Sequence, residues 1–85
     1  MNTFHFVVFS PDGNLFDESV QAVYLRGADG DLAILAGHVP FVTSVKPCRC
    51  IVILSDETKR EGMTEGGLLC VTKDRVTLIS GSFYW

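Results

Sequence analysis

The chain has 85 residues and a net charge of −3, and 47% of its residues are hydrophobic while 20% are charged. A chain of this length forms one small domain with a thin core, because only about 60–65% of the unfolded surface is buried at this size. The lack of a Lys/Arg cluster argues against nucleic-acid binding, which needs a basic patch. No apolar run approaches the ~20 residues that span a bilayer. The sequence predicts a single domain over residues 1–85 without a transmembrane segment.

The amino-terminal residues and the cysteines bear on the cellular compartment. Residues 1–5 lack the basic segment and cleavage site of a signal peptide, so we expect a cytoplasmic location. The three cysteines are odd in number, which fits reduced thiols better than a disulfide framework. Cys48 and Cys50 with Cys70 and the histidines are the alternative, a zinc site, but paired structural zinc ligands are usually two to four residues apart. We therefore expect three small hydrophobic side chains and no metal.

The first third of the chain is predicted to form strands separated by turns. Residues 3–9 are apolar on both faces, which is typical of a strand covered on both sides. Residues 10–14, Ser-Pro-Asp-Gly-Asn, have the composition of a turn. A short strand at residues 15–16 is expected to break at the polar residues 17–19. A second strand rich in β-formers then covers residues 20–25.

The middle of the chain contains the most specific turn. The segment 27–31, Gly-Ala-Asp-Gly-Asp, reads as an exposed acidic turn. Beyond it, two apolar runs at 32–35 and 41–45 flank a turn in which Gly37 can supply a positive φ and Pro40 fixes its own φ. This turn places a histidine beside hydrophobic surface and outside any run of charges. The segment is the clearest candidate for a contact surface.

The last third continues the same pattern. An apolar strand at 50–54 leads into a charged, solvated connection at 55–60 and a polar edge strand at 60–65. The pair Gly66-Gly67 permits a bend or a close backbone approach. Strands then follow on both sides of a two-residue hairpin turn at Lys73-Asp74, over residues 68–71 and 75–79.

These elements together predict the fold class. Apolar residues do not recur at helical spacing over three turns, and the sequence contains no internal repeat or linker. Many short strands in a small chain close a core as two packed sheets. We therefore expect an all-β fold, a two-sheet antiparallel β-sandwich or flattened barrel of about 8–10 short strands.

The sequence shows no catalytic constellation. No glycine-rich segment has the lysine and hydroxyl spacing of a phosphate-binding loop. No serine lies in a glycine-flanked nucleophile elbow, and His5 and His38 are the only candidate bases. We expect a non-catalytic protein that needs no cofactor.

Several short motifs, in their order and spacing, resemble the amino-terminal domain of the epsilon subunit of bacterial F-type ATP synthases. They are Phe-Ser-Pro-Asp-Gly at 9–13, Gly-Asp-Leu at 30–32, Gly-His-Val-Pro at 37–40, Lys-Pro at 46–47, Glu-Gly-Gly-Leu at 65–68 and Val-Thr-Leu at 76–78. The resemblance covers nearly the whole chain. It implies a two-sheet, ten-stranded sandwich.

The resemblance also implies a function. Members of the family are non-catalytic parts of a rotary motor on the cytoplasmic face of the membrane; they bind the gamma subunit and rest on the ring of c subunits, so that ion translocation is coupled to ATP synthesis. By position, the residues that match the ring-facing loop are Asp29, Gly30, Asp31 and Leu32. Those that match the gamma-facing surface are Ser10, Gly37, His38, Pro40 and Val42.

The carboxyl-terminal residues carry two further expectations. Many family members continue as a two-helix hairpin, and we expect no such helical domain here, and hence no inhibition by an extended arm and no ATP sensing. Phe83, Tyr84 and Trp85 are expected to pack on the domain or on gamma. The alternative function is a free-standing β-sandwich binding module that uses these three aromatics as an exposed platform for a small ligand or sugar.

Overall fold

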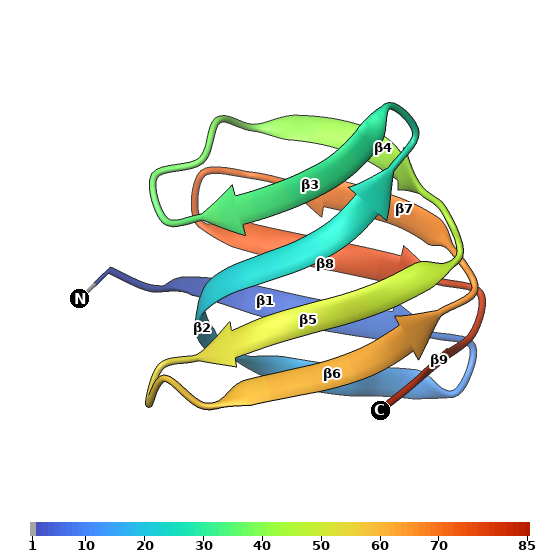
Figure 1. Cartoon of the computed structure of the whole chain (residues 1–85), viewed down its shortest axis with the longest axis horizontal. Coiled ribbons are helices and arrows are strands. Elements are labelled where there is room, and N and C mark those ends of the chain that lie inside the picture. Colours follow the sequence, from blue (N-terminus) through green and yellow to red (C-terminus); the bar gives the residue numbers. More distant parts are fainter. Residues whose placement is uncertain (1) are drawn as a thin grey trace.

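The computed structural model describes residues 2–85, which form nine β-strands (Figure 1). They are β1 (Phe4–Ser10), β2 (Gly13–Gly27), β3 (Gly30–Leu35), β4 (Phe41–Val45), β5 (Cys48–Leu54), β6 (Lys59–Thr64), β7 (Gly67–Val71), β8 (Arg75–Ser80) and β9 (Phe83–Tyr84). This part of the chain contains no helix, and therefore none that could cross a bilayer. The all-β prediction is confirmed.

The strands form two packed layers (Figure 1). The first layer contains β4, β7, β8, β1 and the amino-terminal half of β2. The second layer contains β3, the carboxyl-terminal half of β2, β5, β6 and β9. Strand β2 is long enough to belong to both, and Gly27 at its end pairs with Val45 of β4. The two layers are thus one continuous sheet folded over itself, the expected flattened sandwich.

The structure corrects the prediction of a break at residues 17–19. Strand β2 runs without interruption through these residues, which pair with β1 in the register Val7–Asp17, Phe6–Glu18 and His5–Ser19. The three polar side chains are exposed because they lie at the outer edge of the first layer, where water solvates them without breaking the ladder. The polarity marks an edge of the sheet and not the end of a strand.

One strand pair differs from the predicted antiparallel arrangement. Strands β1 and β8 run parallel, with Phe6 opposite Val76 and Val8 opposite Leu78, whereas the other pairs are antiparallel. The pairing makes β1 a central strand between β2 and β8, as its two apolar faces predicted. These four side chains are part of the core between the layers, together with Val20, Val23, Val52, Leu69 and Phe83.

Glycines permit the close approach that folds the sheet at its corners. A Cβ on Gly67 would lie 2.0 Å from the carbonyl oxygen of Ile79, so no side chain fits there. Gly66 has a φ of +102°, a region that favours glycine, and its amide donates to the hydroxyl of Thr64. The predicted close backbone approach at this pair is confirmed. The hairpin at Lys73-Asp74 is also as predicted, closed by the amide of Thr72 donating to the carbonyl of Arg75.

The cysteines are free thiols, and Cys50 lies fully inside the core. Burial raises the pKa of the Cys50 thiol to about 12, with a smaller contribution from Cys48, so it packs as a neutral hydrophobic group. Within residues 2–85 no group of three or more His, Cys, Asp or Glu side chains has an arrangement that could hold a metal ion.

Candidate functional site

The predicted ring-facing residues lie in the β2–β3 hairpin, with Asp29 in its turn and Gly30, Asp31 and Leu32 at the start of β3. Gly30 has a φ of +131°, which favours glycine and allows the tight reversal. The carboxylate of Asp31 accepts a hydrogen bond from Nε of Arg26 at 3.0 Å, and both side chains are largely exposed. Asp29 has no ion-pair partner in the described part of the chain. The turn therefore presents two solvated carboxylates, one of them uncompensated, while Leu32 is half-buried against the core.

The second predicted turn is held in place by its histidine. Gly37 has a φ of +85°, as its position in the turn predicted. Nδ1 and Nε2 of His38 lie 2.9 Å and 2.6 Å from the carbonyl oxygens of Leu35 and Thr72, and the ring packs edge-on against Phe4 at 5.2 Å between centroids. The imidazole thus ties the β3–β4 loop to the β7–β8 hairpin. The neighbouring side chains of Val39 and Pro40 are exposed.

The outer surface of the first layer carries a row of exposed apolar side chains. The strand register places Phe9 opposite Ile79 and Ile79 opposite Leu68, so these three lie side by side across β1, β8 and β7. Each is between 41% and 48% exposed. Val42 lies opposite Cys70 in the adjoining row and is 64% exposed. We call the surface formed by Phe9, Val42, Leu68 and Ile79 the apolar face.

The predicted gamma-contact residues lie around the margins of the apolar face. Ser10 follows Phe9 at one margin, where its hydroxyl accepts a hydrogen bond from the amide of Asp12. Val42 lies at the opposite margin on β4, and the loop with Gly37, His38 and Pro40 leads into that strand. Ser10 thus lies at one end of the first layer, and the His38 loop, which contacts Phe4 and Thr72, lies at the other end.

Sequence reasoning missed Phe9, Leu68 and Ile79 as surface residues. Each belongs to a strand whose apolar residues point both inward and outward, so hydrophobicity alone does not separate core from surface. The available signal was alternation, since each lies at an odd spacing from a core residue of its own strand, such as Val8, Leu69 and Leu78. The strand register determines which of these side chains face outward.

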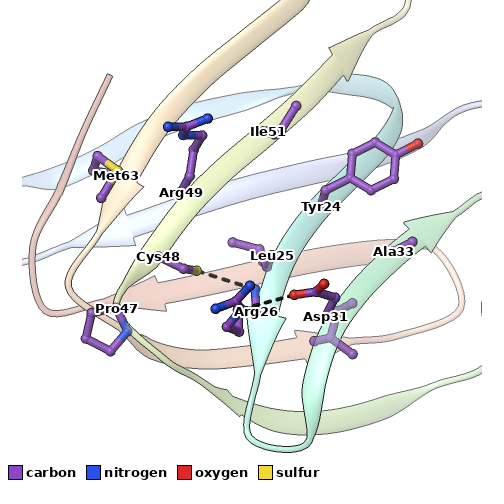
Figure 2. Close-up of a pocket in the computed structure, with 11 residues that line it drawn as sticks. Tyr24, Leu25, Arg26, Asp31, Ala33, Pro47, Cys48, Arg49, Ile51 and Met63 are labelled. Atoms are coloured by element: carbon purple, nitrogen blue, oxygen red, sulfur yellow. Dashed lines mark hydrogen bonds and ion pairs between the residues drawn. The ribbon is translucent and has the colours of Figure 1, made fainter.

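A groove of about 720 Å³ lies on the outer surface of the second layer (Figure 2). Tyr24, Ile51 and Met63 form its apolar part, and Arg26 and Arg49 contribute cationic groups. Figure 2 shows the guanidinium of Arg26 directed toward Asp31, while the backbone amide of Arg26 faces the sulfur of Cys48 at 3.4 Å. Unlike the apolar face, this surface mixes apolar and charged groups.

The carboxyl-terminal aromatics do not form the exposed platform of the alternative prediction. Phe83 is only 6% exposed and belongs to the core. Trp85 packs against Phe16 and Phe83, with ring centroids 5.2 Å and 4.9 Å away, and the guanidinium of Arg60 lies 4.2 Å above its ring. Only Tyr84 is directed to solvent, because neighbouring residues of a strand face opposite sides. The prediction that these residues pack on the domain is confirmed for Phe83 and Trp85.

Comparisons with known proteins agree with the β-sandwich fold. The family model described as "ATP synthase, Delta/Epsilon chain, beta-sandwich domain" matches residues 3–85. In solved structures, a chain of the Euglena gracilis mitochondrial ATP synthase OSCP/F1/c-ring assembly has a TM-score of 0.90 at 21% identity, covering 96% of this chain and 52% of that one. A chain of the Tetrahymena thermophila central stalk/c-ring has a TM-score of 0.81 at 13% identity, covering 98% and 66%. At these identities the likeness concerns the fold.

Similar sequences carry the same family name. The sodium-ion-specific ATP synthase epsilon chain of Acetobacterium woodii is 31% identical over 83 residues, which cover 98% of this chain and 62% of that protein. The epsilon chain of Paracoccus denitrificans is 34% identical, with coverage of 93% and 53%, and that of Bacillus velezensis is 35% identical, with coverage of 94% and 60%. The chain thus spans between about half and three-fifths of the length of these relatives. The chain belongs to the family of β-sandwich domains of ATP synthase delta and epsilon chains.

Proposed function

We propose that this chain is a non-catalytic central-stalk subunit of an F1Fo ATP synthase. In this role it binds the gamma subunit, rests on the ring of c subunits, and is peripheral to the cytoplasmic face of the membrane through the complex. Coupling of ion translocation to ATP synthesis then depends on how well its surfaces fit these two partners. Membership of the delta/epsilon family supports this proposal.

The apolar face is the main support for a contact with the gamma subunit. Phe9, Leu68 and Ile79 form one continuous cross-strand row, and contiguous exposed apolar side chains on a small soluble domain mark interaction sites. The residues assigned to gamma by resemblance lie at its margins, with Ser10 beside Phe9 and Val42 on β4. A gamma subunit seated on this face buries the row and gains the hydrophobic free energy of its burial.

The acidic turn supplies the ring contact. Asp29 and Asp31 project from the β2–β3 hairpin, and charges at the rim of an interface guide association and orientation more than they add affinity. Since Asp31 is already paired with Arg26, Asp29 provides the uncompensated carboxylate. Basic groups on the polar loops of the c subunits are the matching chemistry.

Both candidate bases are engaged in contacts that favour a structural role. The ring nitrogens of His38 face two backbone carbonyls, and His5 pairs with the carboxylate of Asp17. A general base needs a ring nitrogen free to take a proton from a substrate, and neither nitrogen of His38 is free. This arrangement supports a subunit that acts by fit.

A second candidate function rests on the groove of Figure 2. Its apolar floor and the guanidinium of Arg49 suit a small ligand with an apolar body and an anionic group, as in the alternative of a free-standing binding module. One of the two cations of the groove, Arg26, is already neutralised by Asp31. The groove therefore supports ligand binding less strongly than the apolar face supports the stalk role.

Two matched substitutions test the gamma contact. Leu68 and Met63 are 41% and 39% exposed on opposite outer surfaces of the sandwich, so a charge at either position leaves the free domain folded. After co-expression with the cognate gamma subunit, size-exclusion chromatography should show a complex with the wild type and with Met63→Glu. Leu68→Glu should lose it, because the buried unpaired carboxylate costs several kcal/mol. Equal binding by both variants contradicts the assignment.

Asp29→Lys tests the ring contact. We expect it to weaken association with the isolated c ring by roughly 1 kcal/mol at low salt, with the difference shrinking as salt rises. An unchanged affinity at low salt contradicts a ring contact at this turn.

A further inference from the structure

Along two sides of the sandwich the strand edges of the two layers face each other without pairing, and these sides differ in what covers them. On one side, the gap between the amino-terminal half of β2 and β6 is covered by Trp85, whose ring packs on Phe16 and whose Nε1 donates to the carbonyl of Leu15 at 3.5 Å. The adjacent edge of β2 carries the exposed acidic residues Asp17 and Glu18. Charged side chains and covering groups are the usual devices that prevent an edge strand from pairing with another chain.

The opposite side, between β3 and β4, is less protected. Within residues 2–85, β3 pairs only with β2 and residues 41–44 of β4 pair only with β7, so the two strands turn unpaired edges toward each other (Figure 1). The one charged residue in these two strands is Asp31, which already pairs with Arg26. This side of the sheet therefore has a single charged side chain along its edges.

A continuous groove follows these edges. One hollow of about 330 Å³ is lined by residues 27–32 and 41–43, and a second of about 460 Å³ by residues 32–39 and Phe41. Leu32 and Phe41 line both hollows, so they form the middle of one groove. We call it the edge groove. Its acidic end is the turn at Asp29, and its other end is the loop that holds His38.

The backbone of β3 has free hydrogen-bonding groups along this groove. The carbonyl of Arg26 accepts from the amide of Lys46, and its amide faces Cys48, so both groups of Arg26 point away from β3. Asp31, directly opposite Arg26, therefore directs its own amide and carbonyl away from β2, and alternation does the same for Ala33 and Leu35. The carbonyl of Leu35 accordingly meets His38. The backbone amides and carbonyls of Asp31 and Ala33, and the backbone amide of Leu35, have no strand partner within residues 2–85.

We propose that an extended segment of the gamma subunit adds as a strand to the free edge of β3. This inference rests on the proposed function and specifies how part of that contact is made. The apolar face reaches the edge groove at β4, since Val42 belongs to the face and also lines the hollow of about 330 Å³, so a subunit seated on the face continues over β4 to β3. The segment has apolar side chains at alternate positions, which cover Leu32 and Phe41, and a basic residue near Asp29.

Ala33→Pro tests the proposal, with Ala33→Val as its matched control. Proline removes only an amide that points to the open edge, so the β2–β3 ladder of the free domain is kept, whereas valine retains the amide. We expect Ala33→Pro to bind the purified gamma subunit at least tenfold more weakly than the wild type and Ala33→Val to bind within about twofold. Wild-type affinity in Ala33→Pro overturns strand addition but leaves the proposed function standing, while a wild type that fails to bind gamma refutes both.

Amide hydrogen exchange on the wild type gives a measurement that does not depend on a variant's folding. Adding gamma should slow exchange at Asp31, Ala33 and Leu35 at least tenfold, with little change at Leu32 and Ile34, which already pair with β2. Unchanged exchange at the three edge amides overturns the proposal. So does sedimentation of the chain alone as a dimer whose edge amides are protected and which gamma does not dissociate, since a second copy is then the occupant.

Discussion

Nε2 of His38 lies 2.6 Å from the carbonyl oxygen of Thr72, a residue 34 positions later in the chain. Together with the contact to the carbonyl of Leu35, this joins the loop before β4 to the hairpin after β7, at one end of the first layer. The histidine that the sequence marks as a contact residue therefore also determines the position of its own loop.

His38→Ala should destabilise the free domain. The substitution removes the contacts to two carbonyls and the edge-on packing against Phe4, and we expect a loss of about 1–2 kcal/mol in the free energy of unfolding. His5→Ala is the control, since its partner Asp17 is exposed and the loss should stay below about 1 kcal/mol. Urea denaturation followed by circular dichroism measures both. An equal effect of the two substitutions contradicts the structural role of His38.

Gly67→Ala should be among the most damaging substitutions at any glycine of the chain. The added methyl would lie 2.0 Å from the carbonyl oxygen of Ile79, so β7 and β8 must separate, at a cost of about 3 kcal/mol. At Gly81 the same methyl meets nothing within 4 Å, and Gly81→Ala should change stability by less than about 0.5 kcal/mol. A small effect of Gly67→Ala on the midpoint of thermal unfolding would contradict the close approach of these strands.

Trp85→Ala should weaken the closure of the sandwich next to β6. The side chain is half-buried between Phe16, Phe83 and the guanidinium of Arg60, so we expect a loss of about 2 kcal/mol, below the ~3–5 kcal/mol typical of a fully buried tryptophan. The neighbouring Tyr84 is 56% exposed, and Tyr84→Ala should be nearly neutral. If chemical denaturation shows the two variants to be equally stable, Trp85 does not close this side.

Asp17 should contribute to the loss of stability in acid. The hydrogen bond from His5 holds the pKa of the Asp17 carboxyl below its ordinary value of 3.8, with a smaller contribution from Asn14. Between the folded and unfolded pKa values the unfolded chain binds more protons, so this contribution is complete above the ordinary value and is lost as the pH falls through the lower, folded value. Asp17→Asn should flatten the stability profile below about pH 4. An unchanged acid limb in denaturation curves rejects this role.

Much of the fold could be predicted because turn chemistry is local. Gly13, Gly30 and Gly37 all have positive φ values and lie at or beside turns that were predicted, although a positive φ was itself predicted for Gly37 alone. The close approach at Gly66-Gly67 follows from the missing side chains. Residues 3–9 are apolar on both faces, which correctly indicated a central strand. These inferences need only a few neighbouring residues.

The misses all involve residues far apart in the chain. The parallel pairing of β1 with β8 joins segments about 70 residues apart, and no local pattern encodes such a partner. The break predicted at residues 17–19 was wrong because their polarity reflects an exposed edge, which depends on which strands cover β2. The apolar face likewise arises from cross-strand register among β1, β8 and β7. The candidate site could be predicted at its turns but not at its centre.

Nuclear magnetic resonance titration of the isotopically labelled chain with its cognate gamma subunit shows which outer surface of the sandwich binds gamma. Both outer surfaces carry exposed apolar side chains, so the pattern of perturbed amides distinguishes them. The stalk assignment predicts the largest changes at Phe9, Leu68 and Ile79 on the apolar face, with Val42 and the loop of His38 at its margin. Changes confined to Tyr24, Ile51 and Met63 in the groove of the second layer, or no change at saturating gamma, would contradict it.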